Sequence, residues 1–191
     1  MLFIRRSLKD LGALLLFGMF FYVATHNAIV RPKIEKNNSE YRIELLQEPL
    51  VLGIAGHNFL VLRDDKNQIK NELHGLATDT SNHWKYLGNE KSDKLKVWEF
   101  NSPLDFAVQK NETGILLYTG TSAQVYEQWE KARNCKEKIN QLNISYPPFG
   151  VNIHGETENS NSVAYTLTLC MGLNTKHIGL LTPGSTKNLL P

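Results

Sequence analysis

The chain has 191 residues, of which 41% are hydrophobic and 21% are charged, as is typical of one globular domain with a short extension. Its formal net charge is +2, but three basic residues and one acidic residue precede an apolar segment near the N-terminus, so the rest of the chain is neutral. A neutral domain lacks the basic face that neutralises phosphates, which argues against a nucleic-acid partner.

The uncharged segment, residues 11–30, directly follows these basic residues. Its first 14 residues, LGALLLFGMFFYVA, have the length of a signal-peptide core, whereas all 20 just span the roughly 30 Å of a bilayer interior. Cleavage after Ala24 would place the bulky Tyr22 where a small residue is required, so we expect an uncleaved anchor, with a cleaved signal peptide as the alternative. The basic flank stays in the cytoplasm, which predicts a periplasmic or extracytoplasmic domain, inner membrane-anchored or secreted.

We therefore divide the chain into a signal anchor or signal peptide at 1–30, a linker at 31–45 and one globular domain at 46–191. The linker begins with the polar sequence RPKIEKNNSEYR, which contains a proline and an Asn-Asn-Ser cluster. No internal repeat or low-complexity tract interrupts the domain.

Residues 55–77 predict a β-hairpin with a histidine at each outer end. His57 opens an apolar-rich run, residues 64–67 supply the turn, and residues 69–76 return as a second strand with His74 near its end. Because the outer ends of a hairpin lie side by side, we expect the two imidazoles to form a polar pair.

The other elements follow from hydrophobic periodicity and from the residues at their ends. We expect a strand that starts near Val51 and leads into the hairpin, a surface loop or short irregular helix at 79–94, a strand at 95–100 and a buried strand at 114–118. Two helices follow: one that Thr121 or Ser122 caps and that ends at Asn143, and one at 161–171 that Asn159 or Ser160 caps and Gly172 follows. Together these elements predict an α+β domain in which helices pack on an antiparallel sheet.

The chain has two cysteines, Cys135 and Cys170. They could pair in an oxidising compartment, but two cysteines do not make a disulfide framework, so we expect both to be free and buried. There is no CxxC motif and no His/Cys cluster with the spacing of zinc ligands, so we predict neither a metal site nor a cofactor.

Three motifs occur in the order GHNFLVL, ELHGL and NSNSVAYTLTLCMGL. Together they resemble a circularly permuted papain-like fold, the group of NlpC-type peptidases and lecithin retinol acyltransferase-like enzymes, over residues 51–173. In that group a strand histidine is the base, a polar residue on the adjacent strand orients it, and a cysteine at a later helix N-terminus is the nucleophile. The resemblance implies that His57 is the base and His74 its orienting residue, and that Ser160, after Asn159, stands in the position of the cysteine.

Serine in place of cysteine changes the chemistry, because a hydroxyl needs the base to remove its proton, whereas a thiol is already partly ionised. The dipole and backbone N–H groups of a helix N-terminus favour an oxyanion at Ser160. A structural interpretation is equally concrete: Ser160 is then an N-cap worth about 1 kcal/mol, and His57 is an ordinary strand residue.

Ser162 is the alternative nucleophile, although two residues into the helix it more simply reinforces the N-terminus. His154 precedes Ser160 in a loop, where an ordinary exposed histidine is the simpler expectation. Glu72 lies two residues before His74, so it shares a strand face and is able to orient an imidazole, but we expect a solvated carboxylate. The residues expected at the surface or around the core are His83, His177, Trp84, Trp98 and Trp129.

These expectations predict an extracytoplasmic hydrolase or acyltransferase that acts on an amide or acyl bond through Ser160, His57 and His74. For an extracytoplasmic member, the resemblance suggests a cell-wall peptide or a lipid-linked acyl group as substrate. The alternative is a catalytically inactive papain-like binding module of the cell envelope, in which Ser160 does no chemistry. In both cases the N-terminal segment makes the membrane a partner.

Overall fold

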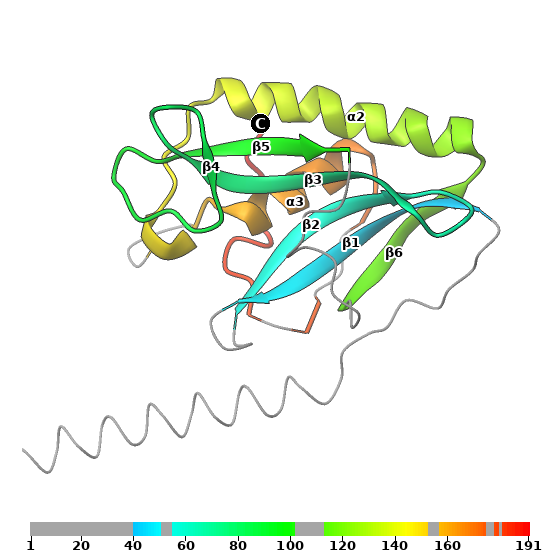
Figure 1. Cartoon of the computed structure of the whole chain (residues 1–191), viewed down its shortest axis with the longest axis horizontal. Helices are drawn as coiled ribbons and strands as arrows, with labels where there is room; N and C mark the ends of the chain where they lie inside the picture. The colour runs from blue at the N-terminus through cyan, green and yellow to red at the C-terminus, as the bar shows by residue number, and fades with distance from the viewer. Residues whose placement is uncertain (1–39, 51–54, 102–112, 153–156, 175–177, 180) are drawn as a thin grey trace, which may run out of the picture.

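The computed structural model describes residues 40–50, 55–101, 113–152, 157–174, 178–179 and 181–191. They form an α+β domain with a six-stranded sheet whose strands all pair antiparallel, and with two α-helices (Figure 1). The predicted fold class is therefore confirmed at this level. In the described ranges no helix is long and apolar enough to cross a membrane, and the predicted anchor at 1–30 lies outside them.

The strands follow the spatial order β4-β3-β2-β1-β6, and β5 pairs with the edge of β3 opposite to the one that pairs with β2 and β4. Their bounds are Tyr41–Leu50 (β1), Ala55–Arg63 (β2), Ile69–Thr78 (β3), Trp84–Lys85 (β4), Lys94–Phe100 (β5) and Thr113–Gly120 (β6). The predicted hairpin is β2 and β3, and the predicted strand at 95–100 is β5. The strand at 114–118 is β6, but it ends the described sheet and Leu116 is 48% exposed, so its predicted burial is wrong.

The first strand differs most from the sequence expectation. β1 begins at Tyr41 and pairs with both β2 and β6, so residues 41–45 belong to the sheet and not to a linker. The strand start expected near Val51 lies outside the described residues, and the described part of this strand, β2, begins at Ala55.

Alternating polar residues explain why β1 was missed. Ile43 and Leu45 face the core, whereas Arg42 and Glu44 point to the other face of the sheet. Both of these charged residues are buried, and they pair with each other at 2.6 Å. The sequence of a strand that buries an ion pair on its second face has the same polar pattern as a linker, so it does not indicate a strand.

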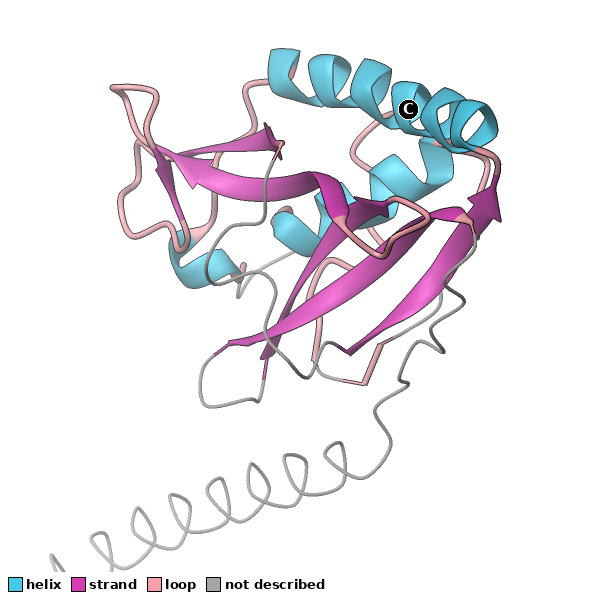
Figure 2. Ribbon diagram, turned by 45° about the vertical axis from the view of Figure 1, so that its right-hand side comes forward, coloured by secondary structure: helices cyan, strands magenta, loops and turns pink. Residues whose placement is uncertain are grey.

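Both helices pack on the same face of the sheet (Figure 2). The first, α2, spans Ser122–Gln141, and Thr121 caps it through a capping box with Gln124. The second, α3, spans Ser160–Cys170, and Gly172 follows it with a positive φ of 71° that suits glycine. The core between them and the sheet contains Ile43, Leu60, Leu73, Leu95, Trp129, Ile139, Val163 and Leu167.

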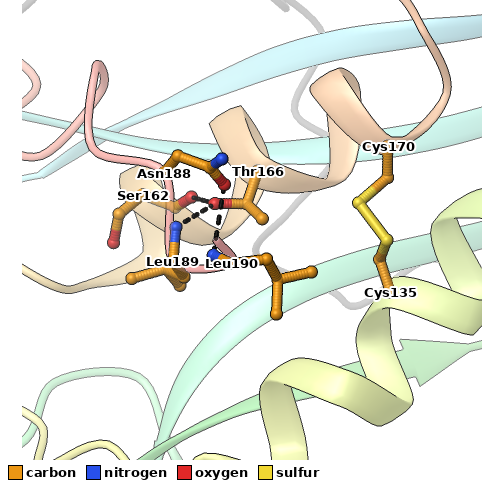
Figure 3. Close-up of a disulfide and its surroundings, with 7 residues drawn as sticks. All are labelled: Cys135, Ser162, Thr166, Cys170, Asn188, Leu189 and Leu190. Atoms are coloured by element: carbon orange, nitrogen blue, oxygen red, sulfur yellow. Dashed lines mark hydrogen bonds between the residues drawn. A yellow bond between two sulfur atoms is a disulfide. The ribbon is translucent and has the colours of Figure 1, made fainter.

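Cys135 of α2 and Cys170 of α3 form a disulfide (Figure 3), so the expectation of two free cysteines is wrong. The Cα atoms lie 6.5 Å apart because the two helices pack against each other on one face of the sheet. The chain's C-terminal tail is held beside this cross-link, where the Leu189 N–H donates to Thr166 Oγ1 at 2.9 Å. The cross-link therefore fixes the distal end of α3.

Candidate active site

Adjacent strands β2 and β3 bring His57 and His74 together. His57 Nε2 lies 3.0 Å from His74 Nδ1, and the ring planes are 13° apart. The side chains are 2% and 0% exposed, respectively. Phe59 stacks on the His74 ring at a centroid distance of 4.4 Å, and Phe100 packs against it edge-on. The predicted polar pair is confirmed, and aromatic packing fixes its orientation.

Glu72 extends the pair into a chain of three groups. Its Oε2 lies 3.1 Å from His74 Nε2, and its side chain is fully buried, so the expectation of a solvated carboxylate is wrong. At the other end, Nδ1 of His57 makes no hydrogen bond with any described residue. The two-residue spacing on one strand is the sequence signal for this contact, but it does not reveal that the face is buried.

Burial makes both imidazoles poor proton acceptors in the resting protein. It lowers the pKa of His74 to about 3. It also lowers the pKa of His57 well below its ordinary value, and the neighbouring His74 adds to this effect. Both rings are therefore neutral at pH 7, the state that a general base requires before it takes up a proton.

The helix start carries a network of polar contacts around Asn159, which is the N-cap. Asn159 Oδ1 accepts from the N–H groups of Asn161 and Ser162. The Ser162 hydroxyl donates to the Asn159 carbonyl and accepts from the Asn159 N–H, both at 2.7 Å. Ser162 therefore has a capping role, which agrees with its simpler interpretation.

Ser160 differs from its neighbours in this network. It is the first residue of α3, so the interpretation of Ser160 as the N-cap is wrong. Its hydroxyl and its backbone N–H form no hydrogen bond with any described residue, and the residue is 5% exposed. The helix start therefore has fewer free backbone N–H groups than expected, because those of Asn161 and Ser162 donate to Asn159 Oδ1.

The first turn of α3 lies where β2 and β3 separate. The outermost paired residues are Leu60 of β2 and Leu73 of β3, so the residues before Leu60 and those after Leu73 do not pair with each other. Beyond it, the Asn58 N–H donates to Oδ1 of Asn161 at 2.9 Å, so a helix side chain takes the place of a strand partner. The helix start is therefore fastened to β2 one residue from His57.

Gly75 allows the same close approach on β3. A Cβ atom at this position would lie 2.9 Å from Ser160 Cα and 2.7 Å from Val163 Cβ, both shorter than normal contacts. Because successive side chains alternate, His74 projects from the opposite face of the sheet to the one that α3 covers. No hydrogen bond joins Ser160 to His57 or His74 among the described residues.

The structure thus unites three groups, His57, His74 and Glu72, and sets the helix start against the same two strands without a bond from Ser160. Of the other candidates, His83 is an exposed residue beside Asp79, while His154 and His177 lie outside the described residues. The tryptophans occupy core and rim positions as expected, with Trp129 buried and Trp84 37% exposed.

No group of three or more His, Cys, Asp or Glu side chains in the described part of the chain is arranged to hold a metal ion. Comparison of the chain with models of known protein families, with curated proteins and with solved structures found no match in any of the three. The resemblance to papain-like enzymes therefore depends on the three sequence motifs, and the catalytic roles of Ser160, His57 and His74 stay predictions.

Proposed function

We propose that this chain is a serine-dependent hydrolase or acyltransferase of the permuted papain-like type, acting on an amide or acyl bond outside the cytoplasm. The observation that carries the proposal is the buried His57–His74 pair, whose Nδ1 end has no hydrogen bond to another described residue. Each polar group loses its hydration on burial, so burying such groups in place of apolar residues costs roughly several kcal/mol. A sheet with a purely structural role does not require that cost.

In the proposed mechanism, Ser160 Oγ attacks the substrate carbonyl carbon and its proton passes to His57. His57 then protonates the leaving group, and water or an acceptor hydroxyl or amine releases the acyl group by the reverse steps. The Ser160 N–H supports the developing oxyanion. The histidine pair projects from the face of the sheet opposite to α3, so substrate binding has to bring Ser160 Oγ to His57 through the gap where β2 and β3 separate.

We infer an extracytoplasmic location from the uncharged segment at 11–30, with cell-wall peptides or lipid-linked acyl groups as candidate substrates. The Cys135–Cys170 disulfide supports this location, because disulfides persist in oxidising compartments. A reporter fused after Asn38 should be active only outside the cytoplasm. Activity of a reporter that works only in the cytoplasm would overturn the location and both substrate classes.

A serine-directed fluorophosphonate probe tests the chemistry on the full-length chain in detergent. Ser160→Ala and His57→Ala should each abolish labelling, and His74→Ala should weaken it. The double variant of Ser160 and His57 should be no worse than either single one, because residues that act as a unit lose nearly all activity at the first substitution. Ser162→Ala is the matched control, since it removes a hydroxyl from the same helical turn. Labelling that survives Ser160→Ala would contradict the proposal.

The second candidate function is a catalytically inactive binding module of the cell envelope. The observation in its favour is that no hydrogen bond connects Ser160 with His57 among the described residues. The variant Ser160→Cys separates the two candidates, because a nearby imidazole and the helix dipole lower a thiol pKa below its usual value of about 8.5. A thiol with an ordinary pKa at this position would favour the binding module.

A further inference from the structure

The hydrogen bonds that link Glu72, His74 and His57 have a defined direction. His57 Nε2 lies 3.0 Å from His74 Nδ1, and His74 Nε2 lies 3.1 Å from Glu72 Oε2. We infer that Glu72 is ionised, and because an ionised carboxylate only accepts hydrogen bonds, His74 then donates from Nε2 and accepts at Nδ1. His57 must then donate from Nε2, which leaves its lone pair on Nδ1.

We propose that Glu72 is a positioning residue that selects this tautomer and stabilises the positive charge when it moves to His74, an inference that rests on the proposed function. When Ser160 Oγ gives its proton to Nδ1 of His57, the Nε2 proton of His57 passes to Nδ1 of His74. His57 is then neutral again, and His74 carries one positive charge at 3.1 Å from the negative carboxylate of Glu72. Reversal of both transfers returns a proton from His57 Nδ1 to the leaving group.

Burial opposes a positive charge on the His74 ring, so the transfer depends on the attraction of the Glu72 carboxylate. Phe59 and Phe100 cover the His74 ring, and a poorly polar environment strengthens the attraction between imidazolium and carboxylate. On β5 the residues opposite His74 and Glu72 are Trp98 and Phe100, which carry no charge. Among the described residues, the titratable groups that face the histidine pair from the packed elements are Glu72 on β3, Glu48 on β1 and Tyr86 after β4.

Glu72→Gln tests the role of the charge, because it keeps the shape and an acceptor oxygen. In the full-length chain it should lower the rate constant of fluorophosphonate labelling about 100-fold, the scale of general base catalysis. The loss of a carboxylate beside an imidazole should also move the acid limb of the rate profile to lower pH. Glu72→Asp keeps the charge and should recover part of the rate. The exposed Glu127→Gln is the control and should label like the wild type.

Labelling of Glu72→Gln at the wild-type rate with an unchanged pH profile would overturn the inference and leave the proposed function intact. If the wild type does not label, or if Ser160→Ala still labels, the proposed function fails instead. Nitrogen-15 NMR of the wild-type histidine rings decides the geometry in every case, including one in which Glu72→Gln does not fold. We expect a hydrogen on Nε2 of both His57 and His74, and a neutral ring with its hydrogen on Nδ1 would exclude the relay.

Discussion

Two buried polar clusters lie on the same face of the sheet, and they end differently. In the ion cluster, the Nε groups of Arg42 and Arg63 bind the two oxygens of Glu44 at 2.6 and 2.8 Å. In the histidine cluster, the chain from Glu72 through His74 stops at Nδ1 of His57, which no described residue contacts by a hydrogen bond. Buried polarity by itself therefore does not mark a site. The distinguishing feature is an acceptor that the fold leaves available for a proton.

The largest expected effect breaks the ion cluster. Glu44→Gln leaves two buried guanidinium groups without their carboxylate, and it should lower the free energy of unfolding by about 3 to 5 kcal/mol in urea titrations. Glu127→Gln is the control, because the exposed Glu127 contacts Lys131 at 3.9 Å and should change stability by less than about 0.5 kcal/mol. A Glu44 variant as stable as the wild type would show that the cluster is not structural.

The disulfide provides a loss of similar size in a region that belongs to neither cluster. Replacing both Cys135 and Cys170 with serine should lower the free energy of unfolding by about 2 to 4 kcal/mol, since the cross-link restricts the unfolded chain. The fluorophosphonate labelling rate of the folded variant should stay at the wild-type value. A rate that falls with stability would mean that the position of Ser160 depends on the cross-link at the far end of α3.

The pH dependence of stability sharpens the comparison, because the two buried histidines titrate near neutrality only in the unfolded chain. The pKa values of His57 and His74 are lowered in the folded state. Below pH 6.5, the ordinary pKa of histidine, the unfolded chain therefore binds more protons than the folded one. Stability should be full above that pH and fall below it, toward pH 3 for His74, by about 1 kcal/mol per pH unit for each histidine. Unfolding titrations at several pH values measure the slope.

The exposed His83 is the control for that slope. His83→Ala should leave the pH dependence unchanged, whereas His74→Phe should reduce it, because phenylalanine has no proton to gain. A wild-type stability that is flat between pH 5 and pH 7 would contradict the buried neutral pair.

The smallest effect compares the two serines of the helix start. Ser162→Ala removes the hydroxyl that completes the capping box, so it should cost about 1 kcal/mol in urea unfolding. Ser160→Ala removes a hydroxyl with no hydrogen bond to a described residue, and its cost should stay below about 0.5 kcal/mol. Equal losses would indicate that Ser160 is also structural and would weaken its assignment as the nucleophile.

Hydrophobic patterns within single segments were sufficient to predict the strands and helices that bury one face. The hairpin of β2 and β3 and both helices were predicted to within a few residues, because alternation and helical periodicity report a half-buried surface. The pairing of His57 with His74 followed from the hairpin geometry alone. β1 was missed because it buries charged residues on its second face, and a pattern of alternating charge does not distinguish burial from exposure.

The sequence by itself determined the α+β class, the hairpin, the histidine pair and the candidate helix start, since each depends on neighbours within one element or one turn. Only the tertiary structure decided the state of the cysteines, the burial of Glu72 and the position of the first turn of α3 between β2 and β3. The physical reason is that these three features arise from contacts between segments far apart in the chain. Hydrophobic periodicity states which face of an element is buried, but it carries no information about what covers that face.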